Sequence, residues 1–164
     1  DTSGAYPGIE AEEKGQSEAI AKNLAEMFGI KVPIVAVVIG EGGSGGALGI
    51  GVADSILMLE NSVYSVISPE GCATILFNDS KKAPDAARSL KIDSISLKSF
   101  GIIDGIVKEP LGGAHRDLKQ ASINLKTAVL KEFKKIDKFE IENLLEKRYN
   151  KYRKIGEFFE KEGE

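Results

Sequence analysis

Short apolar runs mark the expected strands of this chain. Residues 33–39, 55–59 and 63–67 have the length and the β-branched character of strands, and the first predicts a fully buried strand. Ile106 and Val107 follow an Asp-Gly turn and predict one further short strand.

Apolar residues with helical periodicity begin after the first eight residues. Residues 9–29 predict one helix, because the apolar positions fall on a single face: Ile20, Leu24, Met27 and Phe28. Gly29 is expected to end it, and Gly15 within it predicts close packing by another segment. The chain has no initiator Met and opens on turn residues 1–8, which predicts a fragment that begins after a strand.

Four shorter helices are expected in the middle of the chain. Ser68-Pro69-Glu70 starts one of them with a hydroxyl cap, a proline and a first-turn acid. The others cover residues 47–53, 81–90 and 94–100. Pairs of short strands that share one helix favour a spiral of small ββα repeats over a doubly wound sheet, where each strand would have its own crossover helix.

The composition changes at Arg116, where two amphipathic helices are expected. The first is marked by Leu118, Leu125, Val129 and Phe133. Asp137 and Glu140 resemble a capping box that opens the second, whose apolar face is Ile141, Leu144, Leu145, Tyr149, Tyr152 and Ile155. We therefore divide the chain into a core over residues 1–115 and a helical segment over residues 116–164, which packs on the core or on a partner.

The stretch from Gly40 to Ala47 holds five glycines in seven residues and predicts a very close approach to the backbone. It fits a dinucleotide fingerprint, with Glu60 as the ribose acid. It also fits a nucleophile elbow, with Ser44 as nucleophile and His115 as base, although Ser44 fits a turn residue better than a nucleophile and His115 fits a structural or surface residue better than a base. A third interpretation is an oxyanion hole of bare backbone amides, and a fourth is close packing without chemistry.

Composition narrows the class of function. The formal charge of −3 argues against nucleic acid as the main partner, and no apolar run reaches the roughly 18 residues that span a bilayer. Cys72 is the single cysteine, so a disulfide or thiolate zinc site within the chain is excluded. We expect Cys72 to be a small buried residue, the protein to be cytoplasmic, and no metal to be bound.

Five motifs in order give this chain a specific resemblance. They are residues 1–8 (DTSGAYPG), 11–21 (AEEKGQSEAIA), 40–47 (GEGGSGGA), 64–73 (YSVISPEGCA) and 109–116 (EPLGGAHR). Together they resemble the carboxyltransferase alpha subunit of bacterial acetyl-CoA carboxylase. That resemblance implies an α/β crotonase-like fold, a spiral of ββα repeats that is N-terminally incomplete here and is followed by C-terminal helices. The family usually has Pro where Ser3 stands.

The resemblance also implies a chemistry. Such a subunit transfers the carboxyl group of carboxybiotin to acetyl-CoA and yields malonyl-CoA, in an α2β2 hetero-oligomer with a beta subunit and a biotin carboxyl carrier protein. The family's zinc ribbon belongs to the beta subunit. By position, the backbone amides of Gly45 and Gly46 would bind the biotin ureido oxygen. Residues expected to line the biotin site are Gly4, Ala5, Gly42, Gly43 and Ser44.

Two other enzymes remain open at this point. A related acyl-CoA decarboxylase subunit would use the same glycine segment, and a serine hydrolase would use Ser44. A non-catalytic interaction domain is the third alternative.

Overall fold

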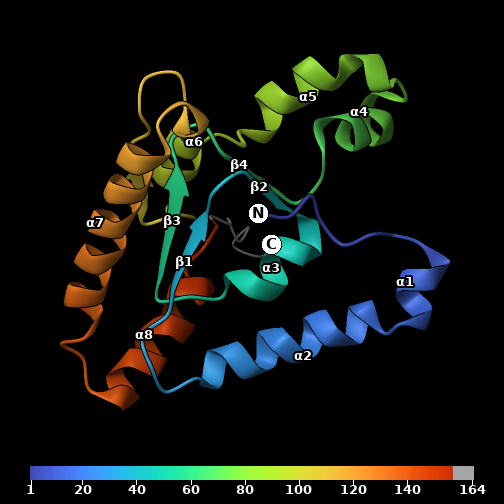
Figure 1. Ribbon diagram of the computed structural model, residues 1–164. Helices are drawn as coiled ribbons and strands as arrows, with labels where there is room; N and C mark the ends of the chain where they lie inside the picture. The colour runs from blue at the N-terminus through green and yellow to red at the C-terminus, as the bar shows by residue number, and fades with distance from the viewer. Residues whose placement is uncertain (157–164) are drawn as a thin grey trace, which may run out of the picture.

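The computed structural model describes residues 1–156 and shows two small parallel sheets surrounded by helices (Figure 1). The first half of the chain contains α1 (Ile9–Glu13), α2 (Gln16–Gly29), β1 (Val35–Val38), β2 (Glu41–Gly43), α3 (Ser44–Gly51), β3 (Ser55–Leu59) and β4 (Val63–Ser65). The second half contains α4 (Pro69–Phe77), η1 (Ser80–Lys82), α5 (Ala83–Leu90), α6 (Ser94–Ser99), β5 (Gly105–Val107), η2 (Ala114–Arg116), α7 (Leu118–Ile136) and α8 (Ile141–Arg153).

The strands form the ββα spiral that the sequence predicts. β1, β2 and α3 make one repeat, and β3, β4 and α4 make the next. The first strand of each repeat enters the sheet β1-β3-β5, and the second enters the sheet β2-β4, with parallel pairing in both. Equivalent strands of successive repeats therefore lie side by side.

The alternation along β3 divides the core between two faces. Leu57 and Leu59 pack with α7 residues on one face, whereas Ile56 and Met58 pack with residues from α6 and α8 on the other. All five residues of β3 are buried because this strand is central. β1 was expected to be fully buried but is half-buried, because it lies at the edge of its sheet.

Two helix predictions differ from the structure, one by an internal break and one by a missing cap. Gly15 divides residues 9–29 into α1 and α2 by adopting a left-handed conformation (φ 73°), and no other described segment comes within 4 Å of a Cβ built there. Gly15 therefore serves a turn and not a packing contact. Asp137 and Glu140 form no capping box: Asp137 ends α7, and Glu140 precedes α8 without a side-chain cap among the described residues.

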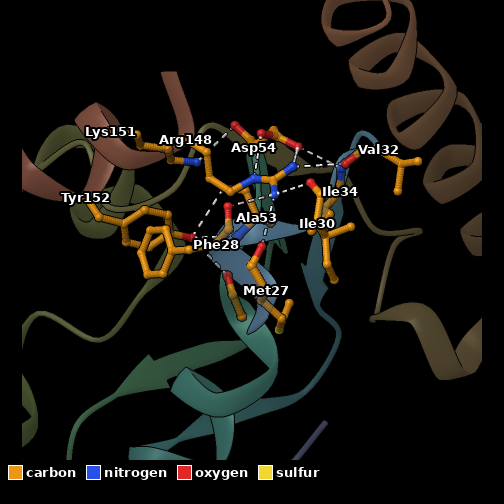
Figure 2. Close-up of polar contacts among 11 residues, drawn as sticks. Met27, Phe28, Ile30, Val32, Ile34, Ala53, Asp54, Arg148, Lys151 and Tyr152 are labelled. Carbon is orange, nitrogen blue, oxygen red and sulfur yellow. Dashed lines mark hydrogen bonds and ion pairs between the residues drawn. The ribbon is translucent and has the colours of Figure 1, made fainter. Parts of the chain in front are cut away.

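The buried face of α8 differs from the predicted one. Tyr149 and Ile141 are exposed, whereas Leu144 and Arg148 are buried and Tyr152 packs against the core. All three guanidinium nitrogens of Arg148 donate hydrogen bonds, to the Asp54 carboxylate and to main-chain carbonyls between residues 27 and 32 (Figure 2). Helix α8 is thus tied to the end of α2 and to the start of β3.

The N-terminal residues extend the second sheet and come very close to the glycine segment. Thr2 donates its N–H to the Glu41 carbonyl at 2.7 Å and accepts from the Gly43 N–H at 2.8 Å. A Cβ at Gly43 would lie 2.2 Å from the Ser3 carbonyl oxygen, and one at Gly46 would lie 2.9 Å from the Gly4 carbonyl carbon. The glycines therefore let two stretches of backbone pack directly on each other.

Gly46→Ala and Gly45→Ala should separate this packing role from helix propensity. Alanine at Gly46 meets the backbone of residues 4 and 5, so we expect a loss of about 1 to 3 kcal/mol in the free energy of unfolding. A Cβ at Gly45 would lie 3.7 Å from Ile20, an ordinary contact, so alanine there should be neutral or stabilising by up to about 1 kcal/mol. Urea denaturation of both variants measures this, and equal effects would contradict the close approach.

Removing the Arg148 side chain should destabilise the fold strongly. Arg148→Leu leaves the Asp54 carboxylate, whose side chain is 5% exposed, without its partner. We expect the free energy of unfolding to fall by about 3 to 5 kcal/mol. Arg153→Leu, at an exposed position of the same helix, is the matched control and should change it by less than about 0.5 kcal/mol. A similar value for both variants would refute the role assigned to Arg148.

Candidate functional site

The site centres on the point where the second strand of the first repeat ends and α3 begins. β2 ends at Gly43, and α3 starts at Ser44 and not at residue 47, so Gly45 and Gly46 belong to its first turn. Ser44 has a positive φ of 53°, which turns the chain sharply from strand to helix. This turn separates the N–H groups of Gly45 and Gly46 from the ladder of β2.

The N-terminal end of α3 is a free hydrogen-bond donor. Among residues 1–156, no side chain caps it, and its first turn holds no acidic residue. The first N–H groups of any α-helix lack partners within the helix and carry the positive end of its dipole. An oxygen atom with negative charge is the ligand that such an end favours.

A pocket of about 360 Å³ lies beside this helix end. Ser3, Gly43 and Ser44 line one part of it, and Ser68 and Glu70, at the start of α4, line another. The N-terminus of α4 is already satisfied, because the Ser68 hydroxyl accepts from the Gly71 N–H at 3.1 Å and Glu70 occupies the first turn. The uncapped end of α3 is therefore the one available to a ligand.

Of the residues that the sequence assigned to the biotin site, Gly42, Gly43 and Ser44 line this pocket, whereas Gly4, Ala5, Gly45 and Gly46 are not part of its lining. A Cβ built on Gly4 would lie 3.1 Å from the Cβ of Ser44, and one built on Gly46 would lie 3.1 Å from the Ala5 nitrogen. The backbone of Gly4 and Ala5 is thus in contact with the glycine turn. Gly42 lies deeper, where its missing Cβ leaves room for the Tyr64 ring.

Tyr64 was not singled out from the sequence. Its ring lies over Gly42, and it lines two pockets that adjoin the glycine segment. Burial raises the pKa of its phenol, which therefore stays protonated at neutral pH. Its position in the motif at residues 64–73 was visible, but its contact with Gly42 depends on the pairing of β2 with β4.

The side chains needed for a serine nucleophile are not assembled around Ser44. His115 is exposed on η2, and no hydrogen bond within the described chain joins it to the Ser44 hydroxyl. Glu60 also lies outside the site, in the turn after β3. Its carboxylate accepts from Lys108 at 2.5 Å, and that hydrogen bond lowers the pKa of Glu60.

Residues 1–156 contain neither a helix suited to span a membrane nor a group of side chains suited to bind a metal ion. None of the helices there has both the length and the apolar character to cross a bilayer. Within the same residues, no three His, Cys, Asp or Glu side chains come together as a metal site. Cys72 is a free thiol, 7% exposed, in the small cluster beneath α4 and α5.

Solved structures share this architecture. A transcarboxylase 12S structure with methylmalonyl-coenzyme A and methylmalonic acid bound superposes with a TM-score of 0.60 at 21% identity, over 77% of this chain and 26% of that one. A Pseudomonas malonate decarboxylase hetero-tetramer in complex with coenzyme A superposes with a TM-score of 0.61 at 16% identity, over 89% and 59%. At these identities the likeness concerns the fold, which is the α/β crotonase-like fold expected from the sequence.

Sequence relatives are much more similar. The "acetyl-coenzyme A carboxylase carboxyl transferase subunit alpha" of Fusobacterium nucleatum is 60% identical over 96% of this chain and 50% of its own length. The protein of the same name from Vibrio cholerae is 57% identical over 95% of this chain and 49% of its own. The chain thus spans about half the length of these curated relatives. A family model described as "acetyl co-enzyme A carboxylase carboxyltransferase-like" matches residues 1–156. This chain belongs to that acetyl-coenzyme A carboxylase carboxyltransferase family.

Proposed function

We propose that this chain is the part of a carboxyltransferase alpha subunit that stabilises negative charge on biotin during transfer of a carboxyl group to acetyl-CoA. Malonyl-CoA, the precursor for fatty acid synthesis, is the product. The observation that carries the proposal is the uncapped first turn of α3, which contains Gly45 and Gly46 and begins at Ser44, a residue that lines the pocket. The names of the relatives at 54–60% identity support the same activity.

Backbone amides are sufficient for this chain's share of the reaction. Carboxybiotin, when bound, would supply the carboxyl group and a ureido oxygen that carries negative charge once the carboxyl group is transferred. Fixed N–H donors that point at such an oxygen lower the barrier without reorganisation. The N–H groups of Gly45 and Gly46 are assigned this role, and Gly42, Gly43, Ser44, Gly4 and Ala5 shape the walls around them.

The residues present fit biotin as the group that the chain handles. The ureido oxygen is a small hydrogen-bond acceptor, and it needs donors with no competing cap, which α3 supplies among the described residues. No side chain of this chain is assigned the role of a base. Gly43 and Gly46 hold residues 3–5 against the turn, so that the pocket wall and the donors form one unit.

The partners follow from this division of labour. We assign acetyl-CoA binding to a separate beta subunit in an α2β2 assembly, and delivery of biotin to the biotin carboxyl carrier protein. A membrane or nucleic acid is not among the proposed partners. A cytoplasmic location agrees with Cys72, a free and buried thiol.

A decarboxylase subunit of the same fold is the second candidate. Malonate decarboxylase structures share the architecture at 16–19% identity. Relatives named as carboxyl transferase subunits share 54–60% of their residues with this chain, which favours carboxyl transfer. The two candidates differ in product, because a decarboxylase releases CO2 and a transferase retains it on acetyl-CoA.

Gly45→Val tests the assignment of the amide donors. A Cβ there would lie 3.7 Å from Ile20, an ordinary contact, and we expect the two methyl groups of valine to crowd the first turn of α3, where the proposed donors lie. In the full-length subunit assembled with its beta partner, we expect turnover in carboxyl transfer between malonyl-CoA and biotin to fall by about 10²- to 10³-fold. Ser44→Ala keeps a Cβ on the left-handed turn, and its turnover should stay within a few-fold of wild type. An equal loss in Ser44→Ala would instead favour the serine hydrolase.

Glu60→Gln tests the dinucleotide alternative. Glu60 is already paired with Lys108, away from the pocket beside α3. We expect calorimetry to detect no NAD or NADP binding at millimolar nucleotide, and the variant to keep the carboxyl transfer rate of wild type. Micromolar nucleotide binding that the substitution abolishes would overturn the proposal.

A further inference from the structure

The far end of α3 is held by a side chain from the C-terminal helix. Tyr152 of α8 accepts the Ala53 N–H at 2.7 Å, and its hydroxyl lies 3.1 Å from the Gly51 carbonyl and 3.3 Å from the Ala53 carbonyl (Figure 2). α3 passes directly into extended backbone at Val52. The phenol therefore takes the place of the C-terminal cap that a helix end normally needs.

Tyr152 is itself rigidly held. Its ring meets the Phe28 ring edge-on, with centroids 5.2 Å apart, and it packs against the core of the first sheet. Arg148, one turn earlier on α8, binds the carbonyls at the end of α2 and the Asp54 carboxylate. Burial raises the pKa of Tyr152 to about 12, so the hydroxyl remains a donor at neutral pH.

Helix α2 makes a second contact of the same kind. The Asn23 side-chain amide donates a hydrogen bond to the Gly49 carbonyl. Ile20, one turn earlier, covers Gly45 and Gly49, where a Cβ would lie 3.7 and 3.4 Å from its side chain. α3 thus receives hydrogen bonds on its C-terminal half from two helices that Arg148 joins to each other.

We propose that Tyr152 and Asn23 are positioning residues, which fix α3 along its axis and thereby place the N–H groups of Gly45 and Gly46. This inference rests on the proposed function. An eight-residue helix is a rod of about 12 Å, so a displacement at one end is transmitted to the other. Oxyanion stabilisation depends on donor distances near 3 Å and is lost when the donors shift.

Tyr152→Phe and Asn23→Ala, with Tyr149→Phe as control, test the inference in the full-length subunit assembled with its beta partner. Tyr149 lies on the same helix and is 56% exposed. We expect kcat for carboxyl transfer to biotin to fall about tenfold in both positioning variants, with KM for biotin within twofold of wild type. Hydrogen exchange at the amides of residues 48–51 should become faster. The control should match wild type in all three measurements.

The assays run well below the melting temperature of each variant, so that loss of folded protein cannot lower kcat. If kcat in Tyr152→Phe equals that of the control, the positioning role is refuted, whatever the exchange rates show. A fall in kcat with unchanged exchange at residues 48–51 also refutes it. Should Tyr152→Phe not fold, Asn23→Ala decides by the same criteria, because Asn23 is exposed on α2. Absence of carboxyl transfer by the wild type would refute the proposed function, and hydrogen exchange would then decide whether α3 is held as described.

Discussion

The buried guanidinium of Arg148 connects elements that no sheet joins to one another, namely α8, the end of α2 and the segments that precede β1 and β3. Arg148 reaches from α8 to the carbonyls of Met27, Ile30 and Val32, and its partner Asp54 also accepts the Ile34 N–H at 2.7 Å. A cation at the negative end of α2 is favourable, and the planar fork of arginine serves several acceptors that lysine could not. Because burial of an ion pair is costly unless every donor is satisfied, this geometry tolerates little change. Ile34 directly precedes β1 and Asp54 directly precedes β3, so the positions of both strands depend on these contacts.

The sequence predicts the elements whose signals are local. β3 at 55–59, β5 and the Ser68-capped start of α4 lie where the apolar runs and the cap indicate. Arg148 was missed because charged residues on an amphipathic helix normally face solvent. Its spacing of four residues from both Leu144 and Tyr152 was the available signal, but its acceptors lie more than 90 residues away in the chain. A sequence pattern does not contain that pairing.

The glycine segment shows the same limit at the site. Its composition indicates a close approach, and the structure supplies one partner: the chain's own residues 3–5, which lie against Gly43 and Gly46. The space freed by the missing side chains is therefore filled by protein. What the turn offers a ligand is the N–H edge of α3, on which the amide hypothesis depends. Neither Tyr64 above Gly42 nor Asn23 at Gly49 was accessible from local spacing, since both contacts require the packed fold.

Ser44 explains why the turn is not made of glycine throughout. The left-handed backbone of Ser44 costs about 1 kcal/mol more than glycine would. A Cβ built on Gly4 would lie only 3.1 Å from the Ser44 Cβ, so the absence of a side chain at Gly4 makes room for Ser44. Gly4 and Ser44 are thus complementary, and Ser44 limits the freedom that a further glycine would give the unfolded chain and the turn. A rigid turn is needed because backbone donors contribute to catalysis only when they are fixed before the charge develops. On this argument the proposed role of Ser44 lies in the constraint on its backbone and not in its hydroxyl.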